Sequence, residues 1–429
     1  MRLVANISGA LDRRTRSEDP AFREAVSAIV QRVRDGGWDA LVVEAERIDR
    51  APPRLVEVAP FAAQARATWP AETLAAVELA FANVTRFHEG TRPRDAMVET
   101  MPGLTVAKEW RAIDRVGLYV PGGGAPLFST LLMLAIPARA AGVREIVVVT
   151  PPRADGGLDP AIALAAELCG IDAIWTVGGA QAIAALAFGA GEIAPVAKIA
   201  GPGNAWVAAA KAMVASTPGG PAIDLPAGPS ELLVIADSSA DPATVAADLL
   251  SQAEHDPDAE VVLITTDAAL AERVIAEADR QLADIPRACA AMGQAKAVVV
   301  ATLAEAVSLA NDWAPEHLSL AVADPEALIR HVRNAGAIFV GHGVAESFGD
   351  YLAGSSHVLP TGGAARAYGG VTVLSFCKEV SVLRATPAAS RAVAAPAAAL
   401  ARLEGLEAHA RAAELRATPP QVAPTRQRA

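Results

Sequence analysis

The sequence predicts an α/β fold with two Rossmann-like α/β modules on parallel sheets, and three observations predict it. From about residue 140, short β-branched runs alternate with Ala-rich amphipathic stretches at the spacing of βαβ units. This alternation forms two blocks, residues 144–204 and 231–341, joined by the Gly/Pro-rich segment PGGPAIDLPAGPS. Parallel strands in such units are covered by helices on both faces. We therefore expect two separate sheets, each buried between helices.

Each block contains strand-and-helix pairs in regular order. In the first block, strands are predicted at 144–152, 173–179 and 197–204, each followed by a helix, in DPAIALAAELCG, AQAIAALAFG and AWVAAAKAMVAS. In the second block, strands are predicted at 231–237 and 260–267, followed by helices in PATVAADLLSQAEH and ALAERVIAEADRQLADI, and then by KAVVVAT, LSLAVADPEALIRHVRNAG and AIFVGHG.

The segments that flank the two modules are predicted to be helical. Residues 18–115 are expected to be mainly helices, for example in FREAVSAIVQRVRDGG and ETLAAVELAFANVTRFHEG. After residue 385 the chain becomes Ala-rich, and the stretch ARLEGLEAHARAAELRA predicts a small C-terminal helical extension. The polar, Pro-rich ending ATPPQVAPTRQRA predicts disorder.

The bulk composition excludes several classes of partner. The 429 residues are 52% hydrophobic, so the chain can bury a large core. An aromatic content of 4% argues against base-stacking surfaces, and a net charge of −11 argues against phosphate backbones and anionic membranes. The beginning of the sequence lacks the apolar region of a signal peptide, and no apolar stretch has membrane-spanning length. We expect a cytoplasmic protein that acts on small molecules, without nucleic acid or membrane partners.

The cysteines do not point to a thiolate metal site or to disulfides. Cys169, Cys289 and Cys377 lie far apart, and there is no CxxC pair. We therefore expect neither a Cys-rich zinc site nor a disulfide framework. Any transition-metal site in this chain would have to use nitrogen and oxygen ligands.

The seven histidines supply the candidate chemistry, and four of them lie in motif-like segments. His317 follows Glu316 in WAPEHLSL, where the pair could form a helix start or an acid/base pair. His357 lies in a Gly/Ser-rich loop, FGDYLAGSSHVLPTGG, which also contains Asp350. The other two segments are LLSQAEH, with Gln252 and His255, and EGLEAHA, with Glu404 and His409. Four histidines together with Asp350 and Gln252 would suit a metal with N/O ligands.

Gln252 and His255 stand three residues apart at the end of a predicted helix. That spacing places both side chains on one helical face in the last turn. Asp256-Pro257 is then predicted to stop the helix before the apolar strand VVLIT. Spacing alone indicates that the two side chains point the same way, but not what they bind.

Two Gly-rich stretches are candidate anion or nucleotide sites. VGLYVPGGGAPLFST (116–130) and KIAGPGNAWV (198–207) each place Gly and Pro before a predicted helix. Such turns expose backbone N–H groups. Neither stretch matches the GxGxxG dinucleotide fingerprint, and strand-to-helix turns in any α/β protein use glycine. From the residues alone, a cofactor site and a plain structural turn remain equal alternatives.

Together these segments resemble the histidinol dehydrogenase family over about residues 20–417. The segments that carry the resemblance are YVPGGGAPLFST, the Pro pair at 151–152, TVGGAQAIAALAFG, KIAGPGNAWV, DLPAGPSELLVIAD, DLLSQAEH, APEHL, GDYLAGSSHVLPT and LEGLEAHA. The resemblance implies NAD-dependent oxidation of L-histidinol, through L-histidinal, to L-histidine in a homodimer that holds one Zn²⁺ per subunit. In the family, zinc mainly orients the substrate. One departure is Gly362-Gly363, where the family often has an aromatic residue.

The resemblance also assigns roles to residues of this chain. It implies a catalytic acid/base pair, Glu316 and His317. It implies zinc ligands at Gln252, His255, Asp350 and His409, with His409 supplied by the other subunit. It implies NAD contacts at Tyr119, Gln181 and Asn204. It implies substrate contacts at Ser129, Ser230, Gln252, His255, Glu316, His317, Asp350, His357, Glu404 and His409.

The resemblance and the block structure together give an expected domain division and leave alternatives of function. The expected parts are an arm at 1–17, an α/β domain at 18–115 and 232–380 with most zinc ligands, an inserted NAD-binding α/β domain at 116–231, a helical dimerisation extension at 381–417 and a disordered tail at 418–429. The alternatives are a dehydrogenase of the same family for another small polar alcohol, a metal-dependent hydrolase and a non-catalytic binding protein. The hydrolase reading leaves both Gly-rich turns without a role.

Overall fold

The computed structural model describes residues 1–4, 19–122, 126–226 and 228–417, and it divides into two compact units. The first unit comprises residues 1–92 and 113–376, and the second comprises residues 93–112 and 377–429. The predicted disordered tail and most of the predicted N-terminal arm lie outside the described residues. No helix in the described part of the chain is long and apolar enough to cross a membrane.

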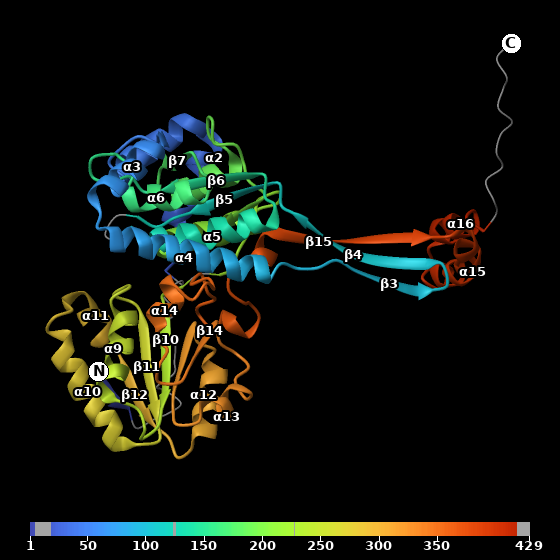
Figure 1. Ribbon diagram of the computed structural model, residues 1–429. Coiled ribbons are helices and arrows are strands. Elements are labelled where there is room, and N and C mark those ends of the chain that lie inside the picture. Colours follow the sequence, from blue (N-terminus) through green and yellow to red (C-terminus); the bar gives the residue numbers. More distant parts are fainter. Residues whose placement is uncertain (5–18, 123–125, 227, 418–429) are drawn as a thin grey trace, which may run out of the picture. The chain divides into compact units, whose positions relative to one another are not determined.

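One half of the first unit is built on a six-stranded sheet, here called the β5 sheet, with the order β2-β7-β6-β5-β8-β9 (Figure 1). Its strands pair in parallel except β2, which pairs antiparallel with β7. The strands are β2 (Leu55–Glu57), β5 (Arg115–Tyr119), β6 (Glu145–Thr150), β7 (Ala173–Thr176), β8 (Lys198–Ala200) and β9 (Ala222–Ile223).

Helices cover both faces of the β5 sheet. Its apolar residues divide into two clusters, one shared with α3 to α6 and the other with α2, α7 and α8. The neighbouring strand residues Leu118 and Tyr119 fall in different clusters, as the alternation of side chains along a strand requires. The helices are α2 (Pro20–Ile48), α3 (Ala59–Thr68), α4 (Ala71–Gly90), α5 (Phe128–Ala141), α6 (Pro160–Leu168), α7 (Gly179–Phe188) and α8 (Ala205–Ser216).

The other half of the first unit is built on a second six-stranded sheet, the β10 sheet, with the order β1-β12-β11-β10-β13-β14. All its strands pair in parallel, and helices again pack on both faces (Figure 1). The strands are β1 (Arg2–Val4), β10 (Glu231–Ala236), β11 (Glu260–Thr265), β12 (Lys296–Val299), β13 (His317–Ala321) and β14 (Ala337–Val340). The helices are α9 (Pro242–Ala253), α10 (Ala268–Leu282), α11 (Cys289–Met292), α12 (Leu303–Trp313), α13 (Pro325–Ile329) and α14 (Glu346–Tyr351), with short 3₁₀ turns η1 (Pro286–Ala288), η2 (Ala364–Arg366) and η3 (Val373–Phe376).

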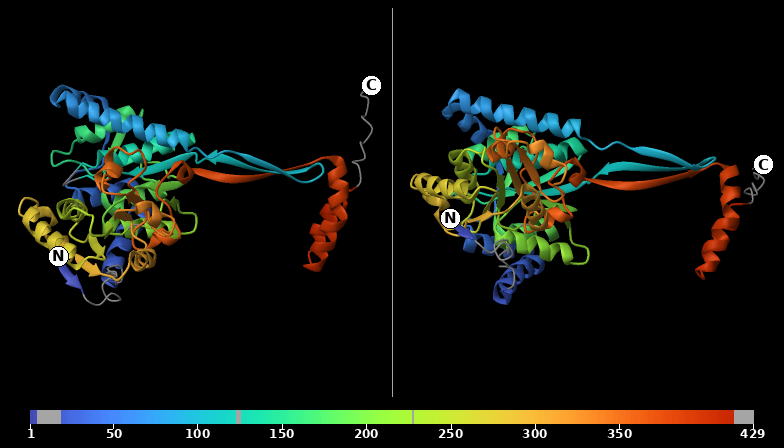
Figure 2. Two further views of the ribbon diagram at one scale, coloured as in Figure 1. Left: turned by 60° about the horizontal axis from the view of Figure 1, so that its bottom comes forward. Right: turned by 90° about the horizontal axis from the view of Figure 1, so that it is seen from below.

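The second unit is a three-stranded antiparallel ribbon that leads into two helices (Figure 2). Its elements are β3 (Ala96–Met101), β4 (Leu104–Ala112), β15 (Cys377–Ala385), α15 (Pro387–Leu403) and α16 (Glu407–Glu414). Every residue of β3 is exposed, and Gly103 in the turn has a φ of +78°. The helical C-terminal extension predicted from the sequence is thus present in the structure.

The predicted α/β class with two parallel sheets is confirmed, and one stretch differs from its prediction. Residues 18–115 contain α2, α3 and α4, as expected, but residues 96–112 form β3 and β4. The physical reason is that this hairpin lacks the buried face from which strands are usually recognised. Its long-range partner β15 begins 265 residues after β4 ends, counted from Ala112 to Cys377.

Candidate functional site

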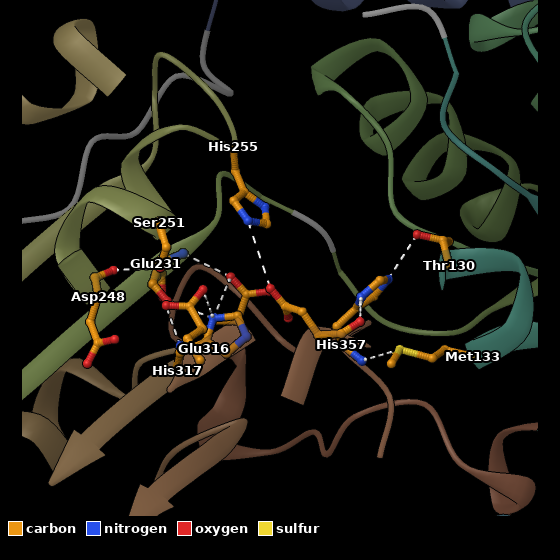
Figure 3. Close-up of polar contacts among 11 residues, drawn as sticks. Thr130, Met133, Glu231, Asp248, Ser251, His255, Glu316, His317 and His357 are labelled. Atoms are coloured by element: carbon orange, nitrogen blue, oxygen red, sulfur yellow. Dashed lines mark hydrogen bonds and ion pairs between the residues drawn. The ribbon is translucent and has the colours of Figure 1, made fainter. Parts of the chain in front are cut away.

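Two buried acids, Glu231 and Glu316, lie where β10 and β13 begin, and the carboxylate of each accepts a hydrogen bond from the backbone N–H of the other. The N–H of Glu231 donates to Oε2 of Glu316 at 2.8 Å, and the N–H of Glu316 donates to Oε2 of Glu231 at 3.3 Å. The remaining oxygen of Glu231 accepts from the N–H of Gly362 at 2.9 Å. Parallel pairing of Leu232 with His317 brings these strand starts together (Figure 3). The sequence interpretation missed Glu231, although an acid at the head of the apolar run ELLVIA signals a buried polar contact.

His317 is held in one ring orientation by the same strand start. Its Nδ1 lies 3.1 Å from the carbonyl oxygen of Glu231, and the side chain is 5% exposed. Because a carbonyl only accepts, we assign the ring proton to Nδ1, which leaves the lone pair on Nε2. Burial lowers the pKa of His317 to about 3, so the ring is neutral near pH 7. A neutral imidazole with a free Nε2 is equipped to take a proton.

Glu316 is buried beside His317. Burial raises its pKa well above its usual value, and the negative charges of Glu231 and Asp350 act in the same direction, while the Glu231 N–H opposes them. A carboxylate with a raised pKa is a stronger base than a solvated one. The pair Glu316 and His317, which the sequence interpretation named as acid and base, therefore lies side by side at the amino end of β13.

Gln252 and His255 reach this edge from the end of α9. Gln252 is fully buried, whereas the His255 side chain is 41% exposed. The helix ends at Ala253, so His255 lies just beyond it, with its N–H donating to the Gln252 carbonyl at 3.2 Å. The prediction that both side chains share the last helical turn is therefore wrong for His255, because the chain leaves the helix before the Asp-Pro pair.

A third segment, α14, adds two carboxylates to the same place. Asp350 Oδ2 lies 3.9 Å from Nε2 of His255. Glu346, one helical turn earlier, presents a carboxylate oxygen to the same group, and the ligand atoms of His255, Glu346 and Asp350 all lie within 4.8 Å of one another. The sequence interpretation named Asp350 but missed Glu346, although the i, i+4 spacing in ESFGD places both on one helical face.

His357 connects this cluster to the helix that follows β5. Its Nε2 lies 2.9 Å from the hydroxyl of Thr130, and its Nδ1 lies 3.2 Å from the carbonyl oxygen of Asp350 (Figure 3). Its backbone N–H donates to the sulfur of Met133 at 3.3 Å. Thr130 and Met133 belong to α5, so the histidine bonds to both halves of the first unit. Ser129, predicted as a substrate contact, is the buried neighbour of Thr130.

The three predicted cofactor residues lie around the carboxyl ends of the β5-sheet strands. Tyr119 ends β5, and its hydroxyl accepts from the N–H of Gly179 at 3.3 Å. Gln181 is fully buried on α7 and donates through Nε2 to Asp49 at 3.0 Å, while its Oε1 has no hydrogen-bond partner among the described residues. Asp49 also accepts from the N–H of Gly178 at 3.0 Å. A buried amide oxygen without a partner is a group that a ligand could satisfy.

The turn after β8 completes this edge. Gly201 has a φ of +127°, and a Cβ at this position would lie 2.1 Å from the carbonyl oxygen of Tyr119. Asn204 caps α8, with its Oδ1 accepting from the N–H groups of Trp206 and Val207. The strand order changes direction between β5 and β8, since β6 and β7 lie on one side and β9 on the other. Ligands of open α/β sheets bind at such a switch point, outside the carboxyl ends of the strands.

A buried ion pair holds the turn after β8. Lys211 Nζ donates to Asp224 Oδ1 at 2.5 Å and to the carbonyl oxygen of Gly201 at 2.8 Å, and the N–H of Gly201 donates to Asp224 Oδ2 at 2.8 Å. The two side chains are 2% and 0% exposed. The sequence interpretation missed this pair because nothing in the local pattern of α8 marks Lys211 as buried.

The remaining predicted residues lie elsewhere. Ser230 directly precedes Glu231 at the start of β10, and its carbonyl accepts from the N–H of Glu260 at 2.9 Å. Glu404 and His409 belong to the second unit, where α15 ends and α16 begins, and both are exposed. The sequence-predicted residues of the first unit thus gather at the ends of strands. In the β5 sheet these are the carboxyl ends, here called the β5 edge, and in the β10 sheet they are the amino ends, here called the β10 edge.

Comparisons with known proteins agree with this architecture. The family model described as histidinol dehydrogenase matches residues 12–417. The histidinol dehydrogenase of Xanthomonas campestris pv. campestris (strain 8004) is 48% identical over 412 residues, which is 95% of each chain. That of Xylella fastidiosa (strain 9a5c) is 48% identical over 399 residues, or 92% of each chain. The crystal structure of histidinol dehydrogenase from Elizabethkingia anophelis superimposes with a TM-score of 0.90 at 37% identity, covering 96% of this chain and 95% of that one. The resemblance seen in the sequence is confirmed, and the chain belongs to the histidinol dehydrogenase family.

Proposed function

We propose that the chain oxidises L-histidinol through L-histidinal to L-histidine, with NAD as the hydride acceptor in both steps. The observation that carries the proposal is the position of His317 and Glu316, buried next to the cluster formed by Gln252, His255, Glu346 and Asp350. An acid/base pair beside a set of N/O ligands can both deprotonate an alcohol and hold a substrate in place.

The donor set suits a zinc ion. One imidazole and carboxylate oxygens within 4.8 Å of one another are ligands of the right type, and one oxygen of the buried Glu346 has no hydrogen-bond partner among the described residues. We assign Gln252, His255 and Asp350 as ligands of this chain, with His409 supplied by the partner subunit. When bound, the ion would orient the imidazole and amine of histidinol and favour the ionised forms of the surrounding carboxylates.

The edge of the β5 sheet suits NAD. Tyr119, Gln181 and Asn204 lie around the switch point, and the unpartnered Oε1 of Gln181 is an acceptor available to the cofactor. When bound, NAD accepts the hydride from the substrate carbon. Hydrogen bonds from His357 to Thr130 and Met133 of α5 join this half to the metal-ligand cluster.

His317 and Glu316 carry out the proton transfers of the reaction. In the first oxidation, Nε2 of His317 takes the hydroxyl proton while the hydride leaves the carbinol carbon, which gives the aldehyde. Glu316 then removes a proton from water as the water adds to the aldehyde carbon. His317 takes a proton from the resulting diol in the second oxidation, and loss of the second hydride gives the carboxylate. Histidinol, two NAD⁺ and one water are consumed, and histidine, two NADH and protons are released.

A stoichiometric assay tests this function. Purified protein with NAD and L-histidinol is expected to form two NADH per histidinol, to lose activity with a chelator and to regain it with Zn²⁺. Oxidation of another small alcohol in preference to histidinol would assign a different substrate within the family. No NADH from any alcohol in the presence of Zn²⁺ would contradict the proposal.

We also propose that the active site is completed across a homodimer. Glu404 and His409 lie on the exposed surface of the second unit, where they could reach a partner. The inactive variants His255→Ala and His409→Ala, mixed in equal amounts after reversible dissociation, are expected to regain about a quarter of wild-type activity. This follows because half of the random dimers are mixed and each mixed dimer has one intact site. If His409 served its own chain, no mixed dimer would be active. The cytoplasmic location expected from the sequence stays a prediction.

A further inference from the structure

Glu346 is a buried acid to which neither the sequence motifs nor the acid/base chemistry assigns a role. It begins α14, it is 3% exposed, and it lies on the same helical face as Asp350. A carboxylate in such a place is costly unless its neighbours use it. Its neighbours include His317, with Nδ1 3.8 Å away, and the amide of Gln252. The ligand atoms of His255 and Asp350 also lie within 4.8 Å of its carboxylate.

The amide of Gln252 has two ends, and a zinc ligand must present its oxygen. We assign the orientation of the amide from its surroundings: only with Nε2 turned toward α14 would it donate to Glu346 Oε1 at 2.8 Å and to the Glu231 carbonyl oxygen at 3.2 Å. His317 Nδ1 lies 3.0 Å from the same nitrogen, but its own proton is directed to Glu231. In the opposite orientation, Oε1 would face these two acceptors and neither bond could form, and the single bond gained would be from the Nδ1 proton of His317 at 3.0 Å.

The two acceptors are not equivalent. The Glu231 carbonyl oxygen already accepts from His317 and lies at the longer distance, 3.2 Å, so it is the weaker of the two acceptors for Gln252. An unprotonated carboxylate oxygen accepts and never donates, and its hydrogen bonds are stronger than those of a neutral acceptor. Burial and the negative charges of Asp350, Glu316 and Asp248 raise the pKa of Glu346 well above its usual value, and a bound cation would favour the unprotonated form. The shorter distance, 2.8 Å, is the one to Glu346. Glu346 is thus the neighbour best able to hold Nε2 in place and leave Oε1 on the opposite side of the amide.

We propose that Glu346 is a positioning residue that acts on the metal through Gln252, by fixing the amide with its oxygen toward the ion. This inference rests on the proposed zinc site. Partners of this kind, which orient a metal ligand without binding the metal, typically contribute about 10- to 100-fold in metal affinity. The role is distinct from that of Asp350, whose carboxylate is itself assigned as a ligand.

A double-mutant cycle on Zn²⁺ affinity tests the proposal. The dissociation constant of Zn²⁺ is measured by chelator competition for the wild type, Glu346→Leu, Gln252→Ala and the double variant. Glu346→Leu is expected to weaken binding by about 10- to 100-fold in the wild-type background and to have no further effect in the Gln252→Ala background. Glu346→Gln, which keeps an acceptor of the same shape, is expected to lose less.

Two controls separate positioning from other roles. Asp248→Asn removes another carboxylate whose negative charge acts on Glu346, and it is expected to weaken Zn²⁺ binding less than Glu346→Gln does. Denaturant unfolding reports whether each variant folds, and Glu346→Gln replaces Glu346→Leu in the cycle if the latter does not. Equal losses in both backgrounds would make Glu346 a direct ligand and overturn the inference, as would wild-type affinity in Glu346→Leu. A wild-type protein that binds no Zn²⁺ would overturn the zinc proposal as well.

Discussion

The two sheets of the first unit share one layout but carry their polar groups at opposite ends. Both are six-stranded, both have helices on two faces, and in each the strand order changes direction beside a central strand, β5 or β10. In the β5 sheet the candidate residues follow the carboxyl ends of the strands, at Tyr119 and Gly201. In the β10 sheet they stand at the amino ends, at Glu231 and His317.

One architecture thus serves two kinds of chemistry. The β5 edge offers glycine turns and an amide, as in Gly179 and Gln181, which suit recognition by shape and hydrogen bonding. Its charged groups, Asp49 and the Lys211–Asp224 pair, are bonded to the turns themselves. The β10 edge offers ionisable groups that burial keeps away from water, as in Glu316 and His317, both about 5% exposed or less. Changes at the β10 edge should therefore affect the chemical step, and changes in the β5 half should affect stability and cofactor binding.

The largest expected effect is at the β10 edge. His317→Ala removes the group with a free Nε2, so kcat should fall by about 10²- to 10⁴-fold, the usual contribution of a general base. Zinc content and the NAD dissociation constant should stay unchanged, because neither assigned site uses this side chain. Metal analysis and NAD titration of the purified variant check both points. Loss of zinc along with activity would show that the division between ligand and base is wrong.

The next effect concerns the buried ion pair in the β5 half. Asp224→Ala leaves the ammonium of Lys211 buried without its partner, which should lower the free energy of unfolding by about 3–5 kcal/mol. Urea unfolding measures this loss. The matched control is Asp114→Ala, which breaks a surface pair with Arg144 whose side chains are 69% and 85% exposed. It should cost less than about 1 kcal/mol. Equal losses in the two variants would mean that burial of the pair has no energetic consequence.

The positions of the strands and of the motif residues beside them could be predicted from the sequence better than the side-chain contacts between distant segments. Apolar runs located β10 and β13, and the motif residues Gln252 and His317 stood next to them, so the candidate site emerged from short segments. Glu346 and Glu231 were missed because their partners lie in other segments: Glu231 bonds to Glu316, 85 positions away. Pairing across such distances depends on sheet register, which local periodicity does not contain.

The smallest effect comes from a buried titratable group in the β5 half, an exception to the pattern that places buried ionisable groups at the β10 edge. His88 on α4 is fully buried, and neither ring nitrogen has a hydrogen-bond partner among the described residues. Burial lowers its pKa from 6.5 to about 4. Between these values the unfolded chain binds the proton and the folded chain does not, so stability falls as pH drops from about 6.5 to 4.

His88→Leu should remove this sensitivity. At pH 7 the variant should be more stable by about 1 kcal/mol or more, because two unsatisfied nitrogens leave the interior. At pH 4.5 the advantage should widen by roughly 2 kcal/mol, since a shift of one pKa unit corresponds to about 1.4 kcal/mol. Urea unfolding of both proteins at the two pH values measures the difference. Parallel stability curves would show that the pKa of His88 does not change on folding, and the assigned effect of its burial would then be wrong.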